Sequence, residues 1–167
     1  MLSAVTQKVS AVHDRADNRE NCMIKVEISD EYDVIKSLFT EYSKIKGAEG
    51  CFVSFDKELA DLKGFYKDGA ILVGYEDGEP AGCIAIKKID ETKCEAKRLF
   101  IKPEYRGKGY ARILLNSMLE QARMLGYKLV TFTTRPDVMK TAYDLYKRME
   151  FEEIGCNDGV VSMKIAL

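Results

Sequence analysis

The sequence predicts an α+β (mixed α/β) domain, in which about four helices flank a central mixed, mostly antiparallel sheet of about seven strands. Three observations lead to this class. Three apolar segments between residues 70 and 102 are joined by short turns, which is typical of antiparallel strands. A strand–helix–strand order over residues 94–134 indicates one parallel pair. The C-terminal segments FEEIG and VVSMKIAL predict a final hairpin.

The first part of the chain contains a strand and two helices. Residues 23–28 (MIKVEI) alternate between apolar and polar side chains, as in a half-buried strand. Ser29 or Asp30 can cap the helix that follows. Apolar side chains recur in it at helical spacing: Tyr32, Ile35, Leu38, Phe39, Tyr42 and Ile45. The loop KGAEGCFVSF then precedes a short helix, for which Asp56 is the predicted cap.

The remaining elements alternate between strands and helices. Residues 70–75 and 80–89 form a hairpin around the turn EDGE, and residues 94–102 form the next strand. Residues 109–125 predict a long amphipathic helix, closed by Gly126 as a left-handed cap. The buried strand YKLVTFTT and a second amphipathic helix over residues 137–149 follow.

Length and charge fit one domain with a short extension. We expect the extension at residues 1–22, helical or disordered, and the domain at residues 23–167. The net charge of −1 argues against a general nucleic-acid or membrane-surface protein. No apolar run approaches the roughly 20 residues that span a bilayer, and the first residues lack a signal-peptide pattern.

Cysteine and histidine usage narrows the chemistry. The 5 cysteines include no C-x-x-C pair, which indicates reduced thiols in the cytoplasm and no metal site. The 1 histidine, His13, lies in the predicted extension. Serine and cysteine hydrolases and most zinc hydrolases depend on a histidine in the folded site, so these classes are disfavoured.

The segment RLFIKPEYRGKGYARILL joins the strand at 94–102 to the long helix. From Lys97 to Arg112 there are six basic residues and one acid, a local charge of +5. Small residues at a helix start let a phosphate approach the backbone N–H groups, although glycines can also serve only to reverse the chain. The Walker pattern is absent, and the dinucleotide pattern G-x-G-x-x-G fails because Arg112 takes the third glycine position.

This segment resembles the cofactor-binding segment of the GNAT superfamily of N-acetyltransferases, through Arg106, Gly109 and Ala111. The segments LGYKLVTFTT and AYDLYKRMEF are similar to further parts of the family, and the element order agrees over the whole core. The run CEAKRLF is similar to a bacterial subgroup usually assigned to amino acids or other small amines. The resemblance implies the GNAT fold, with a β-bulge and a splay at the cofactor strand.

The resemblance also implies acetyl-CoA as cosubstrate, without a metal. Its pantetheine arm would pair with the backbone of Leu99, Phe100 and Ile101. Its pyrophosphate would lie against the residues at the helix start: Arg106, Gly107, Lys108, Gly109, Tyr110, Ala111 and Arg112.

Two residues are candidates for catalysis. Tyr146 matches the family tyrosine that protonates the departing thiolate, with Tyr143 as a weaker rival and core packing as the alternative. Glu95 is the candidate general base, on the face of Leu99 by strand parity unless a bulge intervenes; otherwise it is an exposed glutamate or the partner of a basic residue. A backbone N–H near Leu99 or Phe100 could polarise the thioester carbonyl. Cys94 as an acyl acceptor is disfavoured, because no histidine is near it in sequence.

One position departs from the family pattern. Glu150 stands where the family usually has a glycine before Phe151, so the end of this helix is expected to differ locally. A side chain in a left-handed cap costs about 1 kcal/mol.

Of the two substrates, the acceptor amine is the one that the sequence determines least. Phe52, Phe55 and Tyr66 could line an apolar pocket or pack in the core, and Arg98 could bind a substrate carboxylate or pair with an acid. We expect transfer of acetyl to a primary amine of a small molecule, such as an amino acid or polyamine, by direct attack in a ternary complex. The alternatives are a protein N-terminal or lysine acetyltransferase and a non-catalytic acyl-CoA sensor. Family members are often dimers, which implies a homodimer by analogy.

Overall fold

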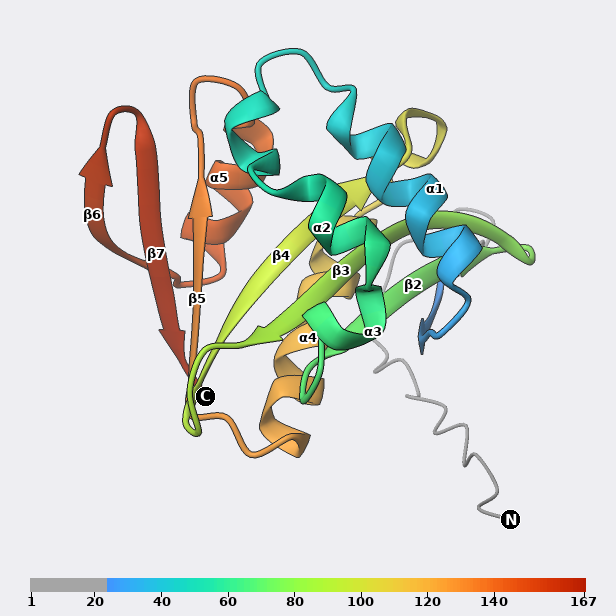
Figure 1. Ribbon diagram of the computed structural model, residues 1–167. Coiled ribbons are helices and arrows are strands. Elements are labelled where there is room, and N and C mark those ends of the chain that lie inside the picture. Colours follow the sequence, from blue (N-terminus) through green and yellow to red (C-terminus); the bar gives the residue numbers. More distant parts are fainter. Residues whose placement is uncertain (1–23) are drawn as a thin grey trace, which may run out of the picture.

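The computed structural model describes residues 24–167, which share one seven-stranded sheet of order β1-β2-β3-β4-β5-β7-β6 (Figure 1). The expected extension at residues 1–22 lies outside the described residues. The strands are β1 (Lys25–Ile28), β2 (Ala70–Glu76), β3 (Glu79–Lys88), β4 (Lys93–Ile101), β5 (Leu129–Thr134), β6 (Glu152–Asn157) and β7 (Val160–Ala166). The helices are α1 (Tyr32–Ser43), α2 (Phe55–Ala60), α3 (Leu62–Phe65), α4 (Tyr110–Met124) and α5 (Lys140–Arg148), with 3-10 helices at Glu49–Phe52 and Pro103–Tyr105.

The strand pairing confirms the three-strand meander, the parallel pair and the final hairpin that the sequence predicts, and it adds the pairs β1–β2 and β5–β7. Strands β1 to β4 are antiparallel neighbours in chain order. Strands β4 and β5 are parallel, because α4 carries the chain back across the sheet between them. The hairpin β6–β7 then adds antiparallel to β5. The sheet is therefore mixed and mostly antiparallel.

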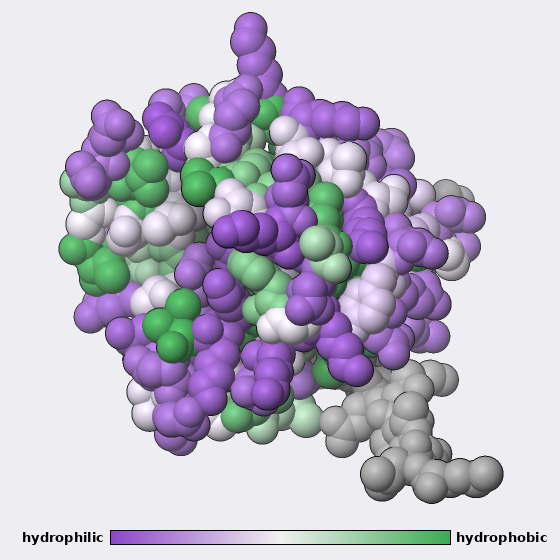
Figure 2. All heavy atoms as spheres, in the orientation of Figure 1, coloured by the Kyte–Doolittle hydropathy of each residue, from purple (hydrophilic) through white to green (hydrophobic). Residues whose placement is uncertain are grey.

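Helices cover both faces of the sheet. Leu72 of β2 is buried in the same cluster as Leu114 of α4 and Leu145 of α5. The next residue, Val73, is buried on the other face, in the cluster of Phe39 of α1. Strands buried on both faces have continuous apolar sequences, as β2 and β3 do. The surface seen in Figure 2 is mostly hydrophilic, with small separate hydrophobic patches.

Two of the predicted helix caps are wrong. The N-cap of α1 is Glu31, with no side-chain cap bond; Ser29 accepts the Glu31 N–H at 3.1 Å just before the helix. Asp56 lies inside α2, which starts after Ser54. Asp61 instead caps α3, because its carboxylate accepts the N–H of the third helical residue at 2.9 Å. The chain thus forms two short helices where one is predicted, which gives five α-helices in residues 24–167.

Helix α5 ends at the unusual position that the sequence indicates. Glu150 has a φ of 66° and so takes the left-handed conformation normally given to glycine. Gly126 after α4 has a φ of 92°, as predicted for a cap. Only the residue type therefore departs from the family pattern at Glu150, because the helix still ends in a left-handed cap.

Candidate active site

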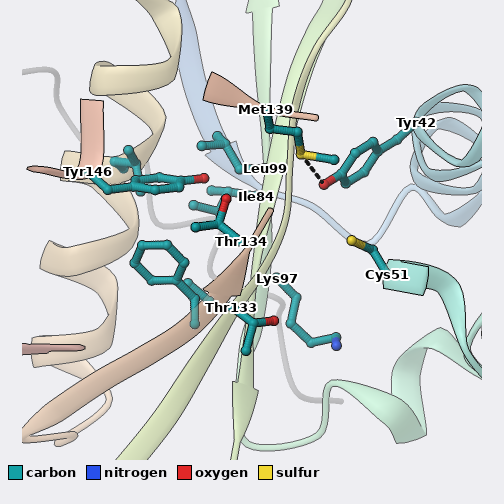
Figure 3. A pocket seen from close by; sticks show the side chains of 12 residues that line it. Tyr42, Cys51, Ile84, Lys97, Leu99, Thr133, Thr134, Met139 and Tyr146 are labelled. Atoms are coloured by element: carbon teal, nitrogen blue, oxygen red, sulfur yellow. Dashed lines mark hydrogen bonds between the residues drawn. The ribbon is translucent and has the colours of Figure 1, made fainter. Parts of the chain in front are cut away.

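The parallel strands β4 and β5 separate partway along their length. Their register runs from Lys93–Leu129 to Glu95–Thr131, and within the described chain no further pair follows. A cavity lies at this opening, between elements from both faces of the sheet (Figure 3). It is lined by Tyr42, Cys51, Ile84, Ala96, Lys97, Leu99, Leu115, Phe132, Thr133, Thr134, Met139 and Tyr146.

A β-bulge interrupts β4 beside the cavity. The register of β3 and β4 shifts so that Arg98 and Leu99 together face one residue, Ile84. Arg98 has a φ of 61°, in the left-handed region. Because a bulge inserts one residue, the alternation of side chains changes phase at this point. Leu99 consequently packs with the cluster of α4, whereas Phe100 is buried with the cluster of α1.

Glu95 lies on the opposite face of β4 from Leu99. Its partner on β3 is Lys87, whose ammonium lies 4.0 Å from the ring centroid of Phe65, on the side of α3. The bulge that the resemblance implied adds a residue between Glu95 and Leu99, so the condition for a shared face is not met. The Glu95 carboxylate is half-buried and 3.3 Å from the Lys97 ammonium. It does not line the cavity.

The turn after β4 is open to a ligand. Gly107 and Gly109 have φ values of 79° and 80°, and a Cβ at either would meet nothing within 4 Å. Gly109 is the N-cap of α4, and no side chain caps this helix. The helix start therefore presents backbone N–H groups and a partial positive charge. These residues fit a bound pyrophosphate.

The basic side chains of the turn differ in their contacts. Arg106 Nε donates to the carbonyl oxygen of Ile101 at 2.9 Å, which holds the turn against the end of β4. Lys108 Nζ lies 2.8 Å from a carboxylate oxygen of Glu76, a side chain only 6% exposed. Arg112 is exposed on α4. Arg112 and the turn backbone are thus open to an anion, whereas Lys108 already contacts a carboxylate.

Two further residues of this segment point inward. The Tyr110 side chain is 4% exposed and packs with Ile24 and Ala81, so it can offer a ligand only its backbone. Ala111 is half-buried against the cluster of α4. Its small size keeps the helix start accessible.

Tyr146 faces the cavity from α5 (Figure 3). Its ring packs edge to face on Phe132, with centroids 4.2 Å apart. Burial raises the pKa of the Tyr146 phenol well above its usual value, so the hydroxyl stays protonated at neutral pH. Tyr143, the weaker candidate, donates its hydroxyl hydrogen bond to Glu153 of β6. Of the two tyrosines, only Tyr146 lines the cavity.

Arg98 pairs with an acid, one of the two roles that the sequence left open. Its Nε and Nη2 donate to the two carboxylate oxygens of Glu58 at 2.9 and 2.5 Å, and Tyr66 Oη donates to Glu58 Oε1 at 2.5 Å. Burial alone would raise the pKa of Glu58, but the hydrogen bonds from Arg98 and Tyr66 outweigh it and lower the pKa. The ring centroids of Phe52 and Phe55 lie 4.2 and 5.4 Å from the guanidinium carbon. Both aromatics therefore surround this ion pair.

Sequence reasoning misses Tyr42 and Met139, which also line the cavity. The Tyr42 hydroxyl donates to the Met139 sulfur at 3.6 Å, and burial raises the pKa of Tyr42 to about 12. Tyr42 belongs to the apolar stripe of α1, where an aromatic residue is normally part of the core. No local signal distinguishes it from its neighbours on that stripe.

The buried Cys94 does not suit covalent catalysis. Cys94 is buried, and burial raises the pKa of its thiol to about 12, so it is a poor nucleophile at neutral pH. Residues 24–167 contain no group of histidine, cysteine and acidic side chains that could hold a metal ion. In the same part of the chain no helix is long and apolar enough to cross a membrane.

Together, the opening beside β4 and the uncapped start of α4 fit a class of protein: transferases that use a coenzyme A thioester. The Acetyltransferase (GNAT) family matches residues 32–151. The chain belongs to this family. It is an acetyl-CoA-dependent N-acetyltransferase.

Similar proteins agree with this assignment. An uncharacterized N-acetyltransferase of Schizosaccharomyces pombe is 30% identical over 131 residues, covering 76% of this chain and 80% of the relative. N-acetylaspartate synthetase of Rattus norvegicus is 29% identical over 108 residues, covering 62% of this chain and 36% of that protein. The structure of YncA from Salmonella typhimurium with its cofactor acetyl-CoA has a TM-score of 0.68 at 18% identity, covering 88% of this chain and 95% of that one.

Proposed function

We propose that this enzyme acetylates a primary amine of a small molecule, such as an amino acid or a polyamine. The observation that carries the proposal is the Tyr146 side chain, which lines the cavity together with Leu99 at the opening of β4 and β5. The rat relative is named for an acetylated amino acid, which supports an acceptor of this size.

The β4 edge and the glycine turn would bind different parts of the coenzyme. The pantetheine arm would add to the backbone of Leu99, Phe100 and Ile101 as another strand does. The absence of β5 partners for these three residues in the described chain supports this. The pyrophosphate would lie at the open backbone of Gly107 and Gly109, at the start of α4.

The reaction needs one new bond and two proton transfers. Acetyl-CoA supplies the acetyl thioester; the amine nitrogen attacks its carbonyl carbon, so that an N–C bond forms and the C–S bond breaks. A backbone N–H near Leu99 or Phe100 would stabilise the negative charge on the carbonyl oxygen. Tyr146 would give its phenolic proton to the departing thiolate, and Glu95 would take the amine proton through a water. Exchange with solvent restores both groups. No residue is acylated, so attack occurs directly in a ternary complex.

The acceptor would approach from the side of α1 and α2. Phe52 and Phe55 give this side an apolar wall, and the half-buried Glu95 lies on the same face of the sheet. The guanidinium of Arg98 already donates hydrogen bonds to Glu58. Arg98 would therefore help to shape this wall, and other groups would bind a substrate carboxylate. We further propose a cytoplasmic enzyme, since Cys51, Cys83, Cys94 and Cys156 are free thiols, and a homodimer by family analogy.

A thiol-release assay tests this proposal. Acetyl-CoA is supplied with amino acids, polyamines, and peptides that carry a free N-terminus or lysine. We expect release of coenzyme A with a small amine, and a kcat lowered about 10²-fold or more by Tyr146→Phe, with the Kd of acetyl-CoA unchanged. Turnover with peptides alone would establish the protein acetyltransferase instead. Binding without turnover on every amine would indicate a sensor, and a Tyr146→Phe enzyme with wild-type kcat would remove Tyr146 from the mechanism.

A further inference from the structure

Arg98 has a backbone conformation that arginine rarely adopts. Its φ of 61° falls at the bulge of β4, where two residues face one on β3. In bulges with a left-handed residue, that residue is commonly glycine, because a Cβ is strained there. A side chain persists in such a conformation only where its surroundings hold it.

The segment 51–58 holds the Arg98 side chain. Two parallel hydrogen bonds join it to Glu58, and Nη1 donates to the carbonyl oxygen of Cys51 at 2.9 Å. The Phe52 ring stacks against the guanidinium from the same segment. On the backbone side, the Arg98 carbonyl oxygen accepts from the Cys83 thiol at 3.3 Å. Both the side chain and the peptide group of Arg98 are therefore fixed.

A need for stability does not explain this ion pair. The side chains of Arg98 and Glu58 are 4% and 1% exposed, and removing two charges from water offsets much of their attraction. An apolar pair of similar volume would hold α2 on the sheet at least as well. Paired hydrogen bonds add orientation, which an apolar contact cannot supply.

We propose that Glu58 is a positioning residue, which acts through Arg98 to keep the bulge in place so that the Leu99 backbone faces the opening between β4 and β5. Leu99 lines the cavity with Tyr146, and it has no β5 partner in the described chain. Glu58 itself does not line the cavity. This role rests on the proposed function, because the acetyl thioester would lie against that backbone.

Substitutions at residue 98 separate the backbone from the side chain. In a Glu58→Gln background, Arg98→Gly and Arg98→Ala both remove the guanidinium, and they differ only in one methyl group. Glycine takes a positive φ freely, whereas for alanine the left-handed conformation is disfavoured roughly 5- to 30-fold. The comparison therefore asks whether the bulge conformation matters once the ion pair is gone.

Two readouts are measured per folded molecule, with the folded fraction taken from circular dichroism. One is kcat with the amine acceptor, and the other is the ratio of the Kd of coenzyme A to that of acetyl-CoA from calorimetry. We expect Glu58→Gln to lower kcat about tenfold. Adding Arg98→Gly should restore most of that loss and the preference for acetyl-CoA, and adding Arg98→Ala should restore neither.

Several results would overturn this role for Glu58. Equal kcat values and Kd ratios for the glycine and alanine variants would leave the ion pair as a support for α2 alone. A Glu58→Gln enzyme with wild-type kcat would do the same. If the wild type turns over no amine, the proposed function fails, and the Kd ratio still decides the role of Glu58. A wild type that is inactive and binds coenzyme A and acetyl-CoA equally would overturn both the proposed function and the role of Glu58, because the bulge then contacts no thioester.

Discussion

Replacing Glu150 by glycine should stabilise the protein. Glu150 is exposed with a φ of 66°, and its N–H donates to the Lys147 carbonyl oxygen at 3.1 Å, a bond that glycine keeps. The left-handed conformation costs a residue with a Cβ about 1–2 kcal/mol. Glycine loses about 0.4–1 kcal/mol more chain entropy on folding, so the net gain is about 0.5–1 kcal/mol. For a chain of this length, that raises Tm by about 1–4 °C.

Thermal unfolding followed by circular dichroism measures this shift, with Glu150→Ala as the matched control. Alanine removes the carboxylate but keeps the strained Cβ, so its Tm should stay at or below that of the wild type. The Phe151 N–H donates to the Tyr146 carbonyl oxygen at 3.1 Å across this cap, so kcat of the glycine variant should stay unchanged. The reasoning is refuted if Glu150→Gly melts no higher than Glu150→Ala.

Three further predictions concern the coenzyme site, the buried thiol and the buried tyrosines. Gly109→Ala should weaken acetyl-CoA binding about tenfold in calorimetry, because its φ of 80° strains a side chain at the start of α4. Gly78→Ala, at a φ of 83° in the β2–β3 turn, is the matched control, and equal Kd values for the two would count against the phosphate site. Cys94→Ala should keep a kcat close to the wild type, because the thiol has a pKa raised to about 12; lost turnover in a folded variant would make the thiol an acyl acceptor. Burial holds the pKa of Tyr42, Tyr66 and Tyr146 above the unfolded value of about 10, so the folded chain keeps protons that the unfolded chain releases at higher pH. The contribution of these tyrosines to the free energy of unfolding is fully present below about pH 10 and should fall above it, by up to about 1.4 kcal/mol per pH unit for each tyrosine. Free energies of unfolding in urea that stay constant from about pH 9 to 11 would contradict this.

Local patterns in the sequence were enough to predict the strands, the meander of β2 to β4, the parallel pair and the final hairpin. The meander and the crossover depend on short turns and on hydrophobic periods, which are visible within a few residues of each other. The break at Asp61 was missed, because the capping bond to the Gly64 N–H does not show in the apolar pattern. Helix α5 begins at Lys140, after the predicted start at residue 137.

In the candidate site too, features built from neighbouring residues could be predicted, whereas those built from residues far apart in the sequence could not. Residues 106–112 could be proposed from the sequence because the glycines, the basic residues and the helix start are contiguous. The network of Glu58, Tyr66 and Arg98 was not, since Glu58 and Arg98 are 40 residues apart and meet only when α2 packs on β4. A glutamate inside a short helix is normally solvent-exposed, and only the fold shows that this one is buried.

The bulge at Arg98 has the largest effect on how the site would work. In a regular strand, Glu95 and Leu99 would share a face, and the base and the coenzyme would compete for the same side of β4. With one inserted residue, Leu99 packs toward α4 while Glu95 lies on the side of α2 and α3. In the proposed mechanism the amine therefore meets its base on one face, and the thioester is held from the opening between the strands. In that mechanism, a single residue in the left-handed conformation separates the acceptor side of β4 from the coenzyme side.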